Sequence, residues 1–416
     1  MINMKCLKKI KPIDVWITVF FIILSVIALY IYKKRAIATI DFNGNRIICG
    51  YVLNGINPLK HVGEPTLVDY LGIVPVGYGN LPYGLFLGNF FYFGFLNLKN
   101  ALFAFRIESI LLMILNILVA KKCFSKIEGG TRLFYYFILF SIFSIHVFCS
   151  YTVGNIGHMI CMLIIISIFL SYENFILSGL AFSLAMIKPQ VAFPFCITFL
   201  FLKKYKVVLF AIVIDVIASF ICSFLVEENV LKMFFDFFNV NVGNNATVYG
   251  LFTIFYKINS KALFPSMFIG ITILILIHIL MRNIKNELIQ FAFPSLVASF
   301  WSYSWGSDSY ILIIPAIVFL YVFFTKNDIG MGNKVSNMLL LVYCFVFLFF
   351  VAIKSVFRDY LLIIFNNMYQ EKNYIERVVI SNTICYIIVL IGILILIGNV
   401  IKIESIMIKK SNMISY

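Results

Sequence analysis

One carboxylate in a short polar stretch is the first candidate for chemistry in this sequence. Asp41 follows the first apolar segment of membrane length, residues 15 to 32, and precedes an amphipathic run that ends in Asn-, Gly- and Pro-rich turns at residues 54 to 58. An acid at the mouth of a membrane protein could act as a general base on a substrate that arrives from water. The same position also suits a residue that caps a short surface helix, so these residues leave both roles open.

A lysine between two apolar segments is the second candidate. Lys188 is followed by Pro189, which breaks a helix, and by Gln190, whose side chain adds hydrogen-bond donors. This grouping suits an anionic group held at a broken helix. Lys188 could equally be a lysine at a helix end whose side chain extends to place its charge at the membrane interface, with no role in chemistry.

Further polar side chains stand out because the segments around them are apolar. Asp215 lies in the middle of an apolar segment, where a charge is costly, so it is either functional or neutral. The aromatic residues 301 to 305 are typical of an interfacial belt, although Asp308 beside them also favours a site. Candidate substrate-binding residues are Arg46, Asn57, Asn80, Arg106, Asn155, His158, Lys188, Gln190, Tyr303, Trp305 and Asp308.

Composition determines the class of protein. The chain has 416 residues, of which 62% are hydrophobic and 12% charged, and its mean hydropathy is +1.01. These values predict an all-α polytopic membrane protein, a single integral membrane domain over residues 1–416. The 9 cysteines are scattered through apolar segments without a metal-ligand spacing.

Several motifs are missing from the sequence. It contains no Asp-x-Asp, Walker loop, Gly-x-Gly-x-x-Gly or His-Glu-x-x-His motif. We therefore expect no metal, no cofactor and no nucleic-acid partner.

The apolar segments predict the topology. After residues 15 to 32 they cover 81–98, 101–120, 133–150, 156–171, 175–187, 191–202, 207–226, 262–281, 288–301, 309–324, 335–353 and 379–401. Lysines cluster before the first segment and in short connectors, which places the N-terminus and these connectors in the cytoplasm of a bacterial inner (cell) membrane protein. An even number of crossings, about 12, then requires that residues 81–98 dip without crossing or that residues 175–202 form one kinked helix. We prefer the first option, which puts Lys188 on the external side with Asp41.

Three long loops lie on the external side in this topology. The first covers residues 33–80, carries Asp41 and is expected to hold short helices on the membrane surface. The others cover residues 227–261 and 354–378. Long loops are where function concentrates in such proteins.

The order and spacing of these motifs resemble glycosyltransferase family 87. Asp41-Phe42, Gly55 and Pro58 resemble the family's first-loop signature, and Gly154-Asn155 resembles its Gly-Gln step. The stretch from Ser178 to Lys206 is similar to its small-residue helix, Lys-Pro turn and basic connector, and residues 305 to 315 resemble its late tryptophan loop. The chain differs from the family pattern at Asn45, Leu59 and Asn155, which concerns the sugar more than the reaction class.

The resemblance implies a fold and a reaction. The fold is a GT-C-like bundle, and the reaction transfers a sugar from a polyprenyl-phosphate donor to a hydroxyl of a glycan or glycolipid acceptor at the external face. Asp41 would be the general base, Lys188 with Gln190 and Arg106 would bind the phosphate, and Asn155, His158, Tyr303, Trp305 and Asp308 would line the sugar or acceptor.

Two other functions fit the same features of the sequence. A polymerase of surface-polysaccharide repeats would use a lipid diphosphate and more cationic groups, for which Arg35, Arg46 and Arg358 are available. A lipid-sugar flippase would need charges deep in the membrane, for which Asp215 is the main candidate.

Overall fold

The computed structural model describes residues 11–33, 40–60, 81–127, 129–144, 154–236, 263–284, 286–299, 308–328, 333–350, 387–403 and 405–406, and every regular element in these ranges is helical. The first half contains α1 (Pro12–Lys33), α2 (Ile40–Leu53), η2 (Pro58–Lys60), α4 (Pro82–Leu87), α5 (Asn89–Tyr92), α6 (Leu98–Phe124), α7 (Gly130–Phe143) and α9 (Gly157–Leu170). The second half contains α10 (Phe175–Ala185), α11 (Pro189–Phe201), α12 (Tyr205–Leu225), α15 (Leu263–Leu280), α16 (Glu287–Ala298), η4 (Asp308–Leu312), α17 (Ile313–Asp328), α18 (Lys334–Leu348) and a last helix, Ile387–Ile403. The expectation of an all-helical chain is confirmed for these residues, and their apolar helices are consistent with a membrane protein.

Asparagine side chains start several of these helices. Each accepts a hydrogen bond from a backbone N–H in the first turn, which satisfies a donor that has no partner inside the helix. The capping residues are Asn97 before α6, Asn174 before α10, Asn286 before α16 and Asn333 before α18. The helix boundaries therefore follow from short polar residues that interrupt long apolar runs.

The two ambiguous segments take the form that the sequence favoured. Residues 81–98 make the two short helices α4 and α5 and a turn rather than a spanning helix. Residues 175–202 make two separate helices, α10 and α11, which meet at Lys188 and Pro189. The break follows from Pro189, which occupies the first turn of α11, where its missing N–H costs nothing.

Helix length differs widely within the bundle. Among the described residues, Leu98–Phe124, Tyr205–Leu225 and Ser309–Asp328 are by themselves long and apolar enough to cross a membrane. In contrast, α10 and α11 have 11 and 13 residues, which gives them about 17 and 20 Å against a hydrocarbon core of about 30 Å. Neither α10 nor α11 is therefore long enough to cross the hydrocarbon core alone, so the turn between them lies within the thickness of the membrane when their other ends lie at its surface.

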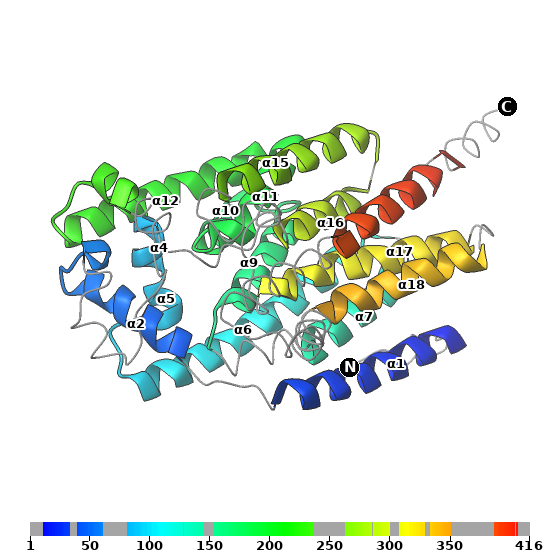
Figure 1. Cartoon of the computed structure of the whole chain (residues 1–416), viewed down its shortest axis with the longest axis horizontal. Helices are drawn as coiled ribbons and strands as arrows, with labels where there is room; N and C mark the ends of the chain where they lie inside the picture. The colour runs from blue at the N-terminus through cyan, green and yellow to red at the C-terminus, as the bar shows by residue number, and fades with distance from the viewer. Residues whose placement is uncertain are drawn as a thin grey trace, which may run out of the picture.

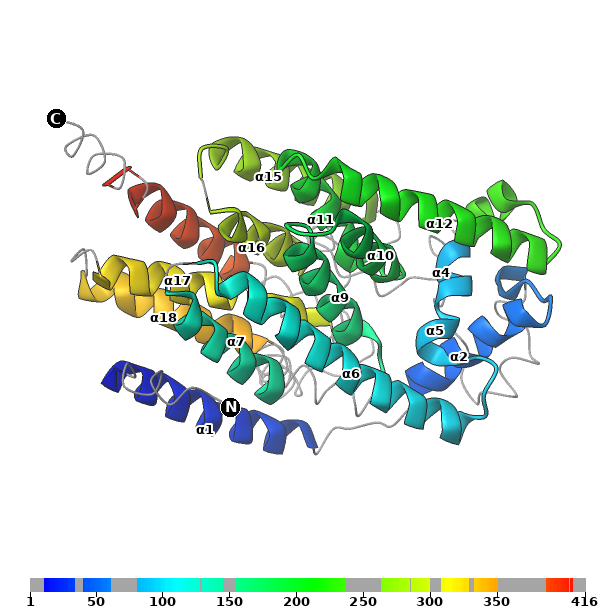
Figure 2. The same cartoon turned by 180° about the vertical axis from the view of Figure 1, so that it is seen from behind.

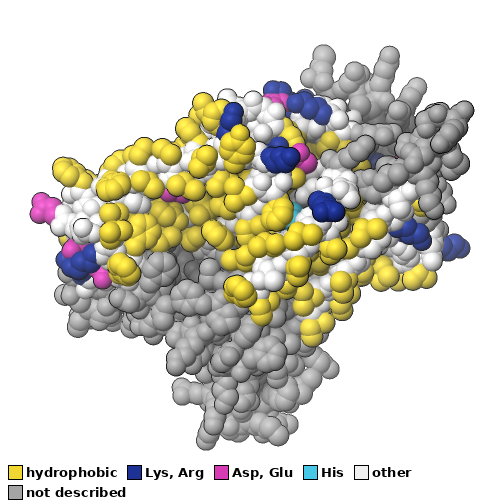
Figure 3. Space-filling model, turned by 90° about the horizontal axis from the view of Figure 1, so that it is seen from above, with side chains coloured by type: hydrophobic (Ala, Val, Ile, Leu, Met, Phe, Trp, Pro, Cys, Tyr) yellow, Lys and Arg dark blue, Asp and Glu magenta, His cyan; other side chains and the backbone are white. Residues whose placement is uncertain are grey.

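The centre of the bundle is formed by α9 and α17. Almost every residue of α9 is buried, and so is nearly all of α17, whereas α6 and α12 bury one face and expose Leu and Ile on the other. A helix that is apolar all round belongs in a core, and one with an apolar outer face in a membrane belongs at the lipid boundary. Figure 3 shows hydrophobic side chains over most of the described surface on the face it views.

One end of the bundle collects basic residues and their ion pairs. Lys122 and Lys126 donate to Glu173 at 2.6 and 2.8 Å, and these bonds hold the pKa of the Glu173 carboxyl below its usual value. Lys204, between α11 and α12, lies 3.2 Å from Glu287 at the start of α16. Connectors far apart in the sequence are therefore tied together at this end, which we call the basic end.

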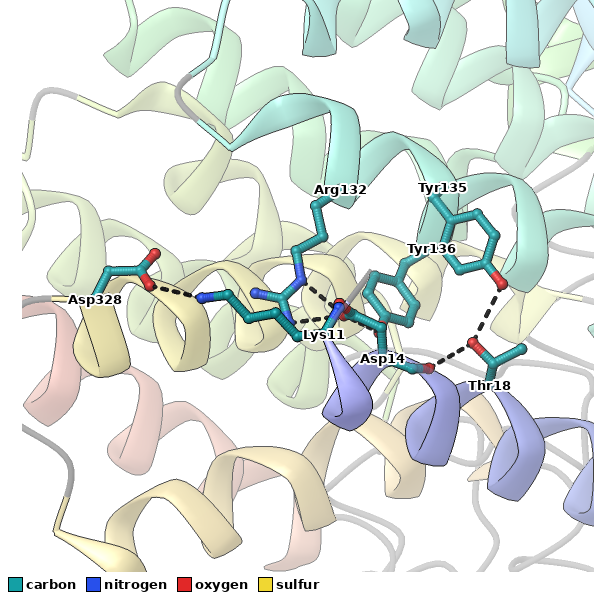
Figure 4. A network of polar contacts seen from close by, with 7 residues as sticks. All are labelled: Lys11, Asp14, Thr18, Arg132, Tyr135, Tyr136 and Asp328. Atoms are coloured by element: carbon teal, nitrogen blue, oxygen red, sulfur yellow. Dashed lines mark hydrogen bonds and ion pairs between the residues drawn. The ribbon is translucent and has the colours of Figure 1, made fainter. Parts of the chain in front are cut away.

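A buried ion pair fastens α1 to the same basic end (Figure 4). Asp14 Oδ1 accepts from Arg132 Nε at 2.7 Å and from the Tyr136 hydroxyl at 2.6 Å, and Oδ2 accepts from the Lys11 backbone N–H at 3.0 Å. Lys11 Nζ also lies 3.5 Å from Asp328 at the end of α17, but both of these side chains are exposed. The Asp14–Arg132 pair is therefore the main polar link between α1 and α7.

The opposite end carries a cap of short helices, made of α2, η2, α4 and α5 (Figures 1 and 2). The end of α2 packs with Leu59 and Leu85 against Cys222 and Val226 at the end of α12. The short helix expected within residues 33–80 is thus present as α2, and residues 61–80 lie outside the described residues.

Two lysines pair with one carboxylate to hold η2 to the end of α12. Lys60 of η2 pairs with Glu228, and Glu228 also accepts from Lys232 at 2.9 Å. These lysines lower the pKa of Glu228 from its ordinary 4.5 to about 2. The cap is thus fixed to α12 by apolar packing and by an exposed ion-pair cluster.

Candidate active site

The first turn of α2 packs directly on the start of the α9 segment. Phe42 is fully buried, and its ring lies 5.7 Å from Tyr92 and 5.1 Å from Phe105. Gly154 has φ of +71°, and a Cβ there would lie 2.6 Å from Phe42 Cβ. Only glycine permits this conformation and this close approach without strain. Asp41 belongs to α2 and comes directly before Phe42, the residue that contacts Gly154. The structure does not describe the side chain of Asp41.

Asn155 and His158 form the polar start of α9. Asn155 Oδ1 accepts from the backbone N–H of Gly157 at 2.9 Å, which caps the helix. His158 is fully buried; its Nδ1 lies 3.2 Å from the Asn155 carbonyl oxygen and its Nε2 lies 2.5 Å from Ser109 Oγ on α6. The imidazole is thus held from both sides, with α6 and α9 joined at this level.

Lys188 reaches the same asparagine from the break between α10 and α11. Its Nζ donates to Asn155 Oδ1 at 2.7 Å, and the side chain is half-buried. The residue has φ −112° and ψ 79°, outside the helical region, because Pro189 begins the next helix. The break therefore directs the ammonium group toward the start of α9.

Two helices begin at this point and run toward the basic end. The N-termini of α9 and α11 lie at Asn155 and Lys188, and the C-termini lie near Glu173 and Lys204. Each helix N-terminus carries a partial positive charge of about 0.5. With the Lys188 ammonium group, these dipoles make a site that favours an anion such as a phosphate.

The site is recessed within the bundle. Ser109 lies about 16 Å along α6 from its first residue, Leu98, at a rise of ~1.5 Å per residue. The cap helices α2, α4 and α5 lie together at one end of the bundle (Figure 2). The polar side chains of Ser109, His158 and Asn155 are therefore surrounded by apolar helices, where charge interactions are stronger than in water.

Two other candidate residues, Arg46 and Asn57, bond to backbone groups of the cap and of the turn before α6. Arg46 donates to Asn43 Oδ1 and, at 2.7 Å, to the Leu96 carbonyl oxygen, which joins α2 to the turn before α6. Asn57 Oδ1 accepts from the Leu59 backbone N–H at 3.0 Å and so shapes the turn into η2. Their described contacts therefore do not place them with Lys188.

The remaining candidates divide into placed and unplaced residues. Arg106 is an exposed residue of α6, and Gln190 is half-buried next to Pro189. Asn80, Tyr303 and Trp305 lie outside the described residues, and Asp308 begins η4 with a side chain that is not described.

Two residues that contact the candidate site were not predicted from the sequence. Ser109 contacts His158, and Tyr83 of α4 donates to the Met186 carbonyl oxygen at 3.0 Å, next to the turn that carries Lys188. Serine occurs often inside membrane helices, and tyrosine often lies at interfaces, so neither residue type signals a site. Only their spatial neighbours identify them.

Asp215 makes a side-chain contact between two helices. Asp215 Oδ1 accepts from Ser183 Oγ of α10 at 2.6 Å, so the carboxyl group joins α12 to α10. Within the ranges that the structure describes, no group of three or more His, Cys, Asp and Glu side chains could hold a metal ion.

The apolar helices indicate a multi-pass membrane protein, and the contact between Lys188 and Asn155 places a polar cluster inside its bundle. Residues 90–307 match the model of glycosyltransferase family 87, a membrane family of GT-C architecture. This match covers more than half of the chain, so the protein belongs to glycosyltransferase family 87 and is a glycosyltransferase. The matched region includes Asn155, His158 and Lys188 and begins after Asp41. No curated protein and no solved structure matches the chain.

Proposed function

We propose that this glycosyltransferase moves a sugar from a polyprenyl-phosphate donor to an acceptor hydroxyl, with Asp41 as general base and Lys188 as the phosphate ligand. The observation that supports this most directly is that three separate segments meet: the start of α2 beside Asp41, the Gly154–Asn155 step and the Lys188–Pro189 break. The products are a glycosylated glycan or glycolipid of the cell envelope and a free polyprenyl phosphate.

The donor phosphate is bound at Lys188. Its ammonium group now donates to a neutral amide oxygen, which a phosphate oxygen can replace or share. The N-termini of α9 and α11 add partial positive charge at the same place. As the bond between the anomeric carbon and the phosphate oxygen breaks, its electron pair moves onto the phosphate, and these groups stabilise the growing charge.

The acceptor is activated by Asp41. The Cα atom of Asp41 lies about 3.8 Å from that of Phe42, and Phe42 contacts Gly154. The carboxylate takes the proton of the acceptor hydroxyl, and the oxygen then attacks the anomeric carbon from the side opposite to the phosphate, with inversion. The buried His158 keeps Asn155 and Ser109 in place beneath this reaction.

The site faces the external side of a bacterial inner membrane in this proposal. Basic residues in short connectors remain in the cytoplasm, and they collect at the end opposite to the cap: Lys121, Lys122, Lys126, Arg132, Lys203, Lys204 and Lys206. The start of α1, where Asp14 pairs with Arg132, is then on the cytoplasmic side as well. The acceptor approaches through the cap from the external aqueous phase, while the polyprenyl chain lies among the helices.

The test is transfer of radiolabelled sugar from synthetic short-chain polyprenyl-phosphate sugars in membranes that contain matched amounts of each variant. We expect Asp41→Asn to abolish transfer and Lys188→Ala to raise the donor KM. Asp328→Asn and Lys121→Ala are the matched controls, because both residues lie at the basic end and should leave transfer unchanged.

Each alternative function has its own result in the same assay. Normal transfer by folded Asp41→Asn would remove Asp41 from the mechanism. Activity with lipid diphosphate oligosaccharides alone would favour the polymerase, and movement of the lipid-linked sugar across the bilayer without transfer would favour the flippase.

A further inference from the structure

The turn that carries Lys188 is held from two sides by helices outside the turn itself. The Tyr83 hydroxyl of α4 donates to the Met186 carbonyl oxygen at 3.0 Å, two residues before Lys188. Ser183 Oγ, one turn earlier in α10, donates to Asp215 Oδ1 of α12 at 2.6 Å. Tyr83, Ser183 and Asp215 are all buried, so these bonds form away from water.

The bond from Tyr83 meets a need created by the broken helix. In an unbroken helix the Met186 carbonyl oxygen would accept from the backbone N–H of residue 190. Pro189 interrupts the helix at this point, and the last carbonyl groups of α10 need other donors. The phenol hydroxyl supplies one of them, and a buried carbonyl oxygen without a donor would be costly.

Tyr83 also completes a ring of contacts around the site. Phe42 of α2 contacts Gly154, Asn155 accepts from Lys188, and the turn before Lys188 accepts from Tyr83. The ring closes within the cap, because Asn89, the first residue of α5, donates to the Cys49 carbonyl oxygen of α2 at 3.0 Å. The position of Lys188 is therefore linked to the helix that carries Asp41 through two routes.

We propose that Tyr83 is a positioning residue that holds the Met186–Lys188 turn so that the Lys188 ammonium group points at the phosphate position beside Asn155. The inference rests on the proposed phosphate-binding role of Lys188. Tyr83 acts on donor binding only through Lys188, and Asp215 supports the same turn from α12 through Ser183.

The experiment measures donor KM, kcat and the thermal unfolding temperature for Tyr83→Phe, Lys188→Ala and the double variant, with short-chain polyprenyl-phosphate sugar as the probe. Tyr136→Phe is the matched control, because Tyr136 is a buried tyrosine whose hydroxyl donates to Asp14 at the basic end. A variant that only loses a buried hydrogen bond lowers the unfolding temperature and leaves the donor KM unchanged.

We expect Tyr83→Phe to raise the donor KM about fivefold, the factor that corresponds to one net hydrogen bond, with little change in kcat. Lys188→Ala should raise the donor KM more, since a charge-assisted bond is stronger. In the Lys188→Ala background, Tyr83→Phe should add no further increase, because the residue through which it acts is gone. Tyr136→Phe should leave KM at the wild-type value.

Two results would overturn the positioning role alone. One is a donor KM for Tyr83→Phe that equals that of Tyr136→Phe, and the other is an equal increase from Tyr83→Phe in both backgrounds. If instead Lys188→Ala leaves the donor KM unchanged, the phosphate-binding role of Lys188 is wrong and the role of Tyr83 is wrong with it.

Discussion

The contact between Phe42 and Gly154 gives the sharpest test of how α2 is placed. Gly154 and Gly129 both have φ of +71°. A Cβ at Gly154 would lie 2.6 Å from Phe42 Cβ, whereas a Cβ at Gly129 would meet nothing within 4 Å. Gly154→Ala and Gly129→Ala therefore impose the same backbone strain, and only the first pushes against α2.

The expected magnitudes follow from these two contributions. A left-handed conformation costs a residue with a Cβ about 1–2 kcal/mol, and overpacking of a buried contact adds about 1–3 kcal/mol. Gly129→Ala should therefore lower the free energy of unfolding by about 1–2 kcal/mol and Gly154→Ala by about 2–5 kcal/mol. Because Phe42 packs between Tyr92 and Phe105, its displacement moves the first turn of α2.

The effect on catalysis should separate the two variants further. A displacement of a catalytic group by about 1 Å can lower a rate about 100-fold. Gly154→Ala should therefore lower kcat by a factor between about 10 and about 100. Gly129→Ala should keep the wild-type kcat. Thermal unfolding in detergent and sugar transfer per folded molecule measure both quantities. The reasoning is refuted if the two variants unfold at the same temperature and transfer sugar at the same rate.

Three other perturbations have expected outcomes. Asp14→Asn leaves the largely buried Arg132 without its counter-ion, so it should lower the free energy of unfolding by about 3 kcal/mol. Sugar transfer per folded molecule should stay unchanged. An unfolding temperature equal to that of the wild type would contradict this. Asp215→Asn keeps an oxygen that accepts from Ser183 and should retain transfer, whereas Asp215→Leu should raise the donor KM; loss of transfer in Asp215→Asn would show that the charge is required. Glu228 has its pKa lowered from 4.5 to about 2 by its two lysine partners, so its stabilising contribution is present above pH 4.5 and is lost as the pH falls to about 2. The difference in unfolding temperature between wild type and Glu228→Gln should therefore shrink over that range, and a constant difference would argue against the ion pairs.

The helices were largely predictable from the sequence because a membrane leaves few alternatives. An apolar run in lipid must satisfy its backbone groups internally, and a helix does so within one segment. The break between α10 and α11 was predictable as well, since Pro189 after Lys188 cannot continue a helix. Counting crossings favoured a segment at residues 81–98 that does not cross, and only the structure shows that it divides into α4 and α5.

The candidate site was predictable only where one residue carries its own signal. Lys188 beside Pro189 and Asn155 after Gly154 are unusual in apolar surroundings. In the structure Lys188 Nζ lies 2.7 Å from Asn155 Oδ1. Arg46 and Asn57 are polar residues close to Asp41 in sequence, and their roles as substrate ligands stay predictions. In the structure Arg46 bonds to the Leu96 carbonyl oxygen and Asn57 to the Leu59 backbone N–H. A polar side chain can hydrogen-bond to backbone groups of the protein as readily as it can bind a substrate. The sequence does not distinguish these two roles.

Composition and apolar periodicity by themselves determined that this chain is a helical membrane protein, and motif order indicated its family, which the match over residues 90–307 confirms. Which side chains meet was decided by tertiary structure alone. Phe42 contacts Gly154, and Tyr83 bonds to Met186, across more than a hundred residues of chain. The physical reason is that lipid and local hydrogen bonding set where each helix begins and ends, whereas packing between helices sets which of their polar residues face one another.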